Sequence, residues 1–153
     1  RLRASLIELC QGTNLTPSRL TVVASESLQR RQALSDLLSA SAFEVSCHTW
    51  LEPRELARHF ATHEAALVSS STLAFEALAT STPIVAVVTA ENQIELARHL
   101  SSMGVPVFDD PVEGAKTLAN GDAASQRVDA AFDGRGVWRV ADALGVSSVV
   151  HSP

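Results

Sequence analysis

The chain has 153 residues, a formal net charge of -5 and only 12 lysines and arginines, so we expect one globular domain without a basic nucleic-acid-binding surface. Hydrophobic residues make up 46%, which favours an ordered core, and no apolar run approaches the roughly 20 residues that a membrane span needs. Two cysteines, Cys10 and Cys47, are too few for a disulfide scaffold and predict reduced thiols in a cytoplasmic protein.

The N-terminus, Arg1 to Ser5, has neither an initiator methionine nor the features of a signal peptide. We therefore expect the sequence to be cut from something longer, or trimmed. Residues 1–153 are interpreted as a single ligand-binding domain, with a helix and linker at 1–19 and a tail at 145–153.

Apolar runs alternate with segments of helical spacing, and no hairpin signal such as Asn-Gly lies between the predicted strands. The predicted strands are 20–24, 43–48, 65–69, 83–88 and 105–108. The predicted helices are 2–11, 26–39, 53–61, 72–79, 91–103, 112–118, 123–131 and 136–144. This alternation predicts an α/β fold with an open, mostly parallel, doubly wound sheet of about five strands and helices on both faces.

Four hydroxyl side chains, Ser69 to Thr72, lie where a predicted buried strand runs into a helix. A helix N-terminus offers free amides and a positive dipole, so the junction is suited to an anion such as phosphate. Glu76 follows about one helical turn later, where a carboxylate would meet a sugar hydroxyl. Ordinary helix capping is the alternative, although one cap needs only one hydroxyl. The segment predicts a nucleotide-type ligand.

Two further loops are expected at the same edge of the sheet, because ligands of such folds bind at the carboxyl ends of the strands. One contains Ser25 and Glu26, and the other contains Asn92 and Gln93. The two amides are suited either to sugar hydroxyls or to capping of the next helix, and the sequence does not separate these roles.

Other interpretations of single motifs are weaker. A nucleophilic serine at the hydroxyl run lacks the glycines of a G-x-S-x-G turn. His59 and His63 share a helical spacing, but a metal site needs further ligands, and surface histidines near a helix end are favoured instead. A phosphoreceiver domain is disfavoured because the third strand ends in Ser69 rather than in an aspartate. We predict no metal and no cofactor.

Two predictions concern the C-terminal third. Asp109 and Asp110 precede Pro111, which is typical of a turn with an N-cap rather than of a metal-binding pair. Trp138 is expected to pack the last helix against the body of the domain.

The segment VSSSTLAFEALATSTPIVAVVTAENQIELA (Val68–Ala97) resembles the C-terminal half of the GT-B nucleotide-sugar enzymes. The resemblance is strongest to the UDP-sugar hydrolase of the pseudaminic-acid pathway and its spore-coat polysaccharide relatives. The ending DGRGVWRVADAL (Asp133–Leu144) resembles the end of the same family, and the similarity covers residues 20–144. It implies a Rossmann-like domain that binds UDP-sugar in a hydrolase or glycosyltransferase of surface-polysaccharide or nonulosonic-acid biosynthesis.

The resemblance also implies roles for individual residues. The hydroxyl turn would hold the diphosphate, and Glu76 would bind the uridine ribose. The Asn-Gln pair would contact the hexose, and the loop after the first strand would approach the base. The implied binding residues are Ser25, Glu26, Ser70, Ser71, Thr72, Glu76, Asn92 and Gln93. The implied catalytic base lies in an N-terminal domain outside this sequence, so no catalytic residue is assigned here. The implied partners are UDP-sugar and that domain, with a homodimer left open.

Two departures from the family leave alternatives open. Ser70 and Ser71 stand where the family often has two glycines, and residue 1 already falls in the helix that follows the family's central strand. Without that strand, strands 20–24 and 65–69 either pair directly, in the order 2-1-3-4-5, or leave a slot. The second functional hypothesis is a non-catalytic binding or assembly module that keeps the fold without binding nucleotide.

Overall fold

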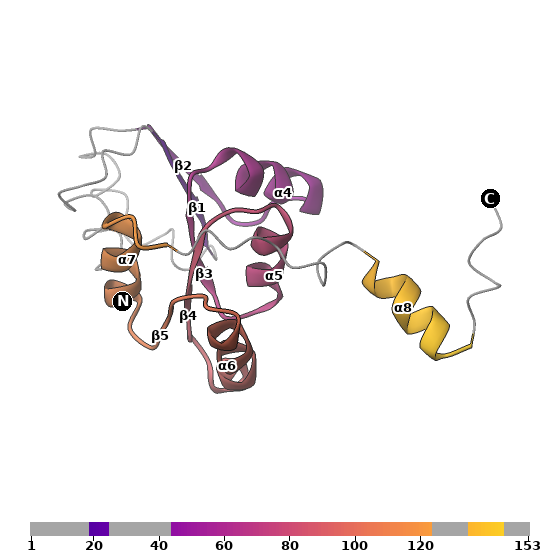
Figure 1. Cartoon of the computed structure of the whole chain (residues 1–153). Coiled ribbons are helices and arrows are strands. Elements are labelled where there is room, and N and C mark those ends of the chain that lie inside the picture. The colour runs from indigo at the N-terminus through magenta and orange to yellow at the C-terminus, as the bar shows by residue number, and fades with distance from the viewer. Residues whose placement is uncertain (1–18, 25–43, 124–134, 146–153) are drawn as a thin grey trace.

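The computed structural model describes residues 19–24, 44–123 and 135–145 and shows an α/β domain whose strands form two parallel sheets (Figure 1). The α/β class and the parallel strands therefore confirm the coarse fold prediction. The predicted helices 2–11 and 26–39, nearly all of 123–131, and both Ser25 and Glu26 lie outside the described residues.

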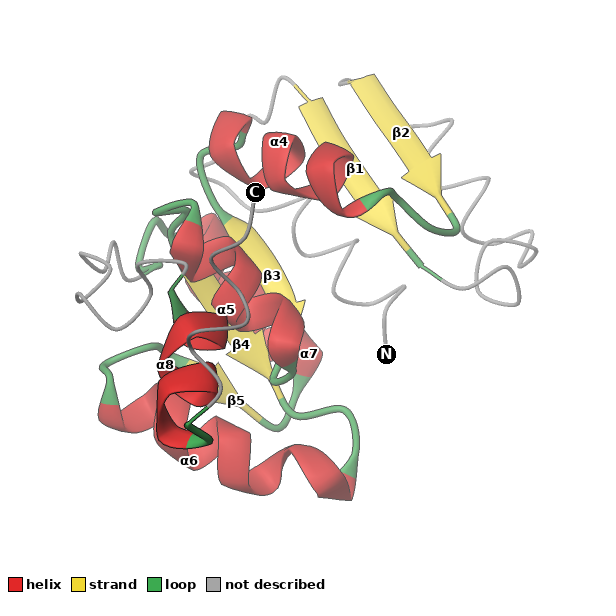
Figure 2. Cartoon of the chain, turned by 90° about the vertical axis from the view of Figure 1, so that its right-hand side faces the viewer, coloured by secondary structure: helices red, strands yellow, loops and turns green. Residues whose placement is uncertain are grey.

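The smaller sheet contains strands β1 (Arg19–Val23) and β2 (Glu44–His48), which run parallel with Arg19 opposite Glu44 and Val23 opposite His48. Helix α4 (Pro53–Thr62) follows β2 and lies across β1 in Figure 2. Proline at the first helical position has its φ already set for a helix and needs no amide partner there, which explains why α4 begins where the sequence predicts.

The larger sheet has the order β3-β4-β5, with all neighbours parallel. Its strands are β3 (Ala66–Ser69), β4 (Ile84–Val87) and β5 (Val107–Phe108). All four residues of β4 are buried, as expected for a central parallel strand that is apolar on both faces. The unbroken apolar run from 83 to 88 is therefore explained by its position in the middle of this sheet.

Helices cover both faces of the larger sheet (Figure 1). Helices α4, α5 (Thr72–Ala79) and α6 (Ile94–Ser102) share a core with β3 and β4, which includes Phe60, Leu78 and Leu100. Helix α7 (Pro111–Ala119) packs on the opposite face, through Gly114. A 3-10 turn at Glu91–Gln93 precedes α6, and Gly104, at φ +84°, follows it in the left-handed region that glycine tolerates.

Helix α5 contacts the sheet through small side chains. Ala74 and Ala77 are fully buried, together with Leu78, and all three belong to the main core cluster. Because alanine keeps a helix axis close to the strands that it covers, the first turn of α5 is held near the carboxyl end of β3.

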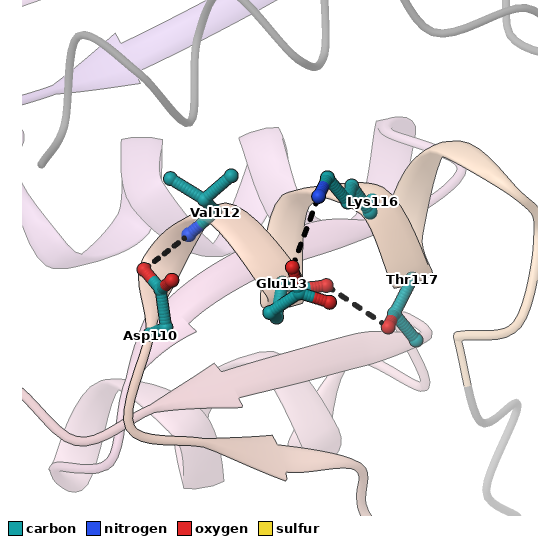
Figure 3. A network of polar contacts seen from close by, with 5 residues as sticks. All are labelled: Asp110, Val112, Glu113, Lys116 and Thr117. Atoms are coloured by element: carbon teal, nitrogen blue, oxygen red, sulfur yellow. Dashed lines mark hydrogen bonds and ion pairs between the residues drawn. The ribbon is translucent and has the colours of Figure 1, made fainter.

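The N-terminus of α7 confirms the predicted capping (Figure 3). Asp110 Oδ1 accepts a hydrogen bond from the Val112 amide at 3.0 Å, directly before the Pro111 position that starts the helix. Along the helix, Lys116 Nζ lies 3.0 Å from Glu113 Oε1, and the Thr117 hydroxyl donates to the Glu113 carbonyl. Asp110 is therefore a structural cap.

Helix α8 (Gly136–Ala143) lies apart from the helices that cover the larger sheet in Figure 1. Val137 is 73% exposed, and Leu144, directly after the helix, is 71% exposed. Trp138 is itself 41% exposed, and its expected role in packing the helix against the body of the domain stays a prediction. No described helix has both the length and the apolar character required to cross a bilayer.

The predicted single sheet of about five strands is not confirmed. Within the described residues, β1 pairs only with β2 and β3 pairs only with β4, so the order 2-1-3-4-5 is not formed. Alternate residues of a parallel strand bond to one neighbour, and the amides of Ala24 and Ala66 donate toward β2 and β4. The backbone groups of Thr21 and Leu67 therefore point toward the other edges of their sheets, and direct pairing of β1 with β3 is not formed within the described residues.

Candidate functional site

The carboxyl ends of β3, β4 and β5 bring their following loops to one edge of the larger sheet. Ser69 is the register partner of Val87, and Val87 is the partner of Phe108. The hydroxyl run after β3 and the loop before the 3-10 turn after β4 are therefore neighbours, as predicted. This edge is the candidate site, and the loop after β1 lies outside the described residues.

The backbone of the hydroxyl run is largely occupied by protein atoms. The Ser70 amide donates to the Val87 carbonyl at 2.8 Å, and the Ser71 amide donates to the Ser69 carbonyl at 2.7 Å. The Leu73 amide donates to Ser71 Oγ at 3.3 Å, so Ser71 is the N-cap of α5. The expectation of free amides at this junction is therefore wrong for Ser70, which pairs with β4, for Ser71, which bonds within the turn, and for Leu73, which is capped. Within the described residues, the Thr72 amide makes no such bond.

The three serine side chains lie in different environments. Ser69 Oγ and Ser71 Oγ are 2.9 Å apart and form a hydrogen bond. Ser70 is fully buried, and its Oγ has no hydrogen-bond partner among the described residues. Side chains alternate along a strand, so Ser70 faces the same side as Val68, which belongs to the core. A buried hydroxyl without a partner costs about 1 to 3 kcal/mol, which makes Ser70 the unexplained group of this turn.

Thr72 and Glu76 form the solvent-facing part of the site. Both are exposed, and they are four residues apart on α5, so they lie on the same side of the helix. The first turn of α5 contains no acidic side chain that would oppose a bound anion. The predicted placement of a carboxylate one turn beyond the helix start is therefore present.

Asn92 and Gln93 have different environments in the structure. Gln93 Oε1 accepts hydrogen bonds from the Thr89 amide at 2.8 Å and from the Thr89 hydroxyl at 3.1 Å, which fixes the loop after β4. Asn92 is exposed, and the N-cap position of its turn, Ala90, makes no side-chain cap. Gln93 thus takes the local structural role that the sequence left open for the pair, while Asn92 faces solvent.

The candidate site contains no cationic side chain in the loops 69–72, 88–93 and 109–110. Exposed carboxylates lie at the same edge, on Glu91, Asp109 and Asp110. An anion at this edge would therefore be held by helix dipole, amide and hydroxyl groups rather than by ion pairs. No group of three or more His, Cys, Asp or Glu side chains within the described residues could hold a metal ion.

A histidine cluster lies outside this site and was missed by the sequence analysis. The ring of His59 lies 5.7 Å from that of His48 and 5.6 Å from that of His63, measured between ring centroids. The four-residue spacing of His59 and His63 was the only local signal. His48 joins them through the crossover from β2 to α4, which sequence spacing alone does not reveal. His59 and His63 lie at the end of α4, as expected, but both are partly buried rather than fully at the surface.

Comparison with protein-family models, with curated proteins and with solved structures found no match to this chain.

Proposed function

We propose that the carboxyl edge of the larger sheet binds a UDP-sugar, and that the chain is the nucleotide-sugar-binding domain of a hydrolase or glycosyltransferase. The observation that carries this proposal is the exposed pair Thr72 and Glu76 at the start of α5, directly after a parallel strand. The resemblance of residues 68–97 to GT-B enzymes supplies the choice of ligand.

The ligand would be held by groups that the protein leaves accessible. The Thr72 amide and hydroxyl would contact one phosphate at the positive end of α5, and the exposed Glu76 carboxylate would accept hydrogen bonds from the ribose hydroxyls. Asn92 would contact the hexose from the neighbouring loop. Catalysis would need a base from another domain. The free, exposed thiol of Cys47 agrees with a reducing, cytoplasmic location, which we include in the proposal.

Glu76→Ala is expected to weaken UDP binding by roughly 10- to 100-fold, since a hydrogen bond to a charged group contributes about 1.5 to 3 kcal/mol. Isothermal titration calorimetry with UDP and with a UDP-N-acetylhexosamine measures this change. Glu95→Ala is the matched control: Glu95 is an exposed carboxylate on α6 that pairs with Arg98. Equal affinities for the wild type and Glu76→Ala, or no binding at millimolar UDP, would contradict the proposal.

A second candidate is the assembly module that keeps the fold without a nucleotide. It is favoured by the occupied amides of Ser70, Ser71 and Leu73 and by the exposed apolar side chains Val137 and Val140 on α8. This candidate predicts a dimer that dissociates on Val140→Glu, measured by sedimentation velocity, together with an absence of UDP binding. A monomer that binds UDP would exclude it.

A further inference from the structure

The histidine cluster joins two parts of the fold that share no β-ladder. His48 ends β2, His59 lies in α4, and His63 directly follows α4. The rings form a continuous series, with His59 between the other two. Since β1 and β3 do not pair, the contact of α4 with the smaller sheet connects the β1–β2 pair to the rest of the described chain (Figure 2).

When the His63 ring is neutral, its hydrogen bonds in this contact have one defined direction. His63 Nδ1 lies 2.7 Å from the His59 carbonyl, which can only accept, so Nδ1 carries the proton. In a neutral ring Nε2 is then the acceptor, and the Thr21 hydroxyl donates to it at 3.0 Å. The Ser46 hydroxyl in turn donates to Thr21 Oγ1 at 3.2 Å. This series of hydrogen bonds links β2 to β1, β1 to His63, and His63 to α4.

A proton added to this contact enters surroundings that are partly buried and close to other imidazole rings. A proton on His63 Nε2 turns that atom from an acceptor into a donor, so the Thr21 hydroxyl must change from donating to accepting. His48 Nε2 is buried and has no hydrogen-bond partner among the described residues. A second or third imidazolium would also lie within about one ring spacing of the first, where like charges repel each other.

Most of the groups around His59 lower its pKa. Burial, His63 and His48 lower the pKa of His59, and Arg19 on β1 adds to this effect. Glu55, one turn earlier on α4, acts in the opposite direction but does not reverse the result. His59 is therefore held neutral more strongly in the closed contact than in an opened one.

We propose that His48, His59 and His63 form a pH-sensitive contact that holds the β1–β2 pair against α4 when neutral and releases it when protonated. The inference is independent of nucleotide binding. In an opened contact His59 takes up a proton at the ordinary histidine value of about 6.5, whereas burial and the two neighbouring rings lower the pKa of His59 in the closed contact. The contact is thus fully stable above that pH and weakens as the pH falls below it.

Hydrogen exchange followed by mass spectrometry tests this directly. Peptides covering β1 and β2 are compared with peptides covering β3 and β4 at about pH 7.5 and pH 5.5, with labelling times scaled to the intrinsic exchange rate. The protection of β1 and β2 is expected to fall at the lower pH, by up to about tenfold per pH unit for each extra proton taken up on opening. The protection of β3 and β4 is expected to stay constant.

Variants separate this contact from general acid sensitivity. His48→Gln/His59→Gln/His63→Gln is expected to abolish the extra loss of protection, and His59→Gln alone is expected to reduce it. His99→Gln is the matched control, because His99 lies on α6 beside Phe75 and away from the cluster. If the triple variant does not fold, His59→Gln decides the result. The proposal is overturned if β1 and β2 respond no more than β3 and β4, if they are unprotected at pH 7.5, or if His59→Gln leaves the loss unchanged.

Discussion

Replacement of Gly114 by valine is expected to destabilise the protein by about 2 to 3 kcal/mol, as overpacking of a tight interface does. A Cβ at this position would lie 3.1 Å from Val87 Cγ2 and 3.2 Å from Leu67 Cδ1. The two further methyl carbons of valine cannot be placed without moving α7 away from β3 and β4. Urea unfolding, followed by the far-ultraviolet circular dichroism signal, measures the change.

Two controls isolate the packing effect. Gly114→Ala has a smaller expected effect, because the gain of about 1 kcal/mol in helix propensity opposes the crowding of a single methyl group. Gly136→Val places the same side chain at the start of α8, where an added Cβ meets nothing within 4 Å. Wild-type stability for Gly114→Val would show that α7 does not pack closely on this sheet in solution.

Ser70→Ala and Ser71→Ala are expected to change stability in opposite directions, with a difference of about 2 kcal/mol between these neighbouring positions. The Ser70 hydroxyl is buried without a partner, so its removal relieves a desolvation cost and raises the free energy of unfolding. Ser71 caps α5 through the Leu73 amide, so its removal leaves that amide unsatisfied. Thermal and urea unfolding of the two variants measure both effects.

The same pair also tests why Ser70 is present. If its hydroxyl serves ligand binding, Ser70→Ala raises the melting temperature and weakens UDP binding together. If Ser70→Ala destabilises the protein as much as Ser71→Ala does, the buried hydroxyl has a partner in solution, and our description of this turn is wrong.

Much of the local structure could be predicted from the sequence. The apolar run at 83–88 became the buried strand β4, α5 has the predicted bounds, and prolines 53 and 111 start helices α4 and α7. These features depend on side-chain periodicity and on the fixed φ of proline, which act within a few residues. The same reasoning could not establish that the strands divide into two sheets, because strand order depends on contacts between distant segments.

The candidate site could be predicted only in part, because contacts between distant segments determine the rest of it. The exposed position of Glu76 follows from its place on α5, which helical spacing determines. The Ser70 amide is not available to a ligand because it donates to the Val87 carbonyl on the neighbouring strand. Secondary-structure propensity does not identify this partner. The histidine cluster also depends on a crossover between distant segments. Its three members were visible in the sequence, but their common location was not.

The small side chains beneath α5 have a consequence for recognition. Ala74 and Ala77 have no rotamers to exchange, and they hold the helix against a sheet whose central strand, β4, is buried on both faces. The helix backbone that carries Thr72 and Glu76 is therefore fixed in position. A bound molecule would have to order few protein atoms at this end of the domain. The binding surface at this helix would be preorganised. Selectivity would then depend on the shape of the ligand rather than on closure of the protein around it.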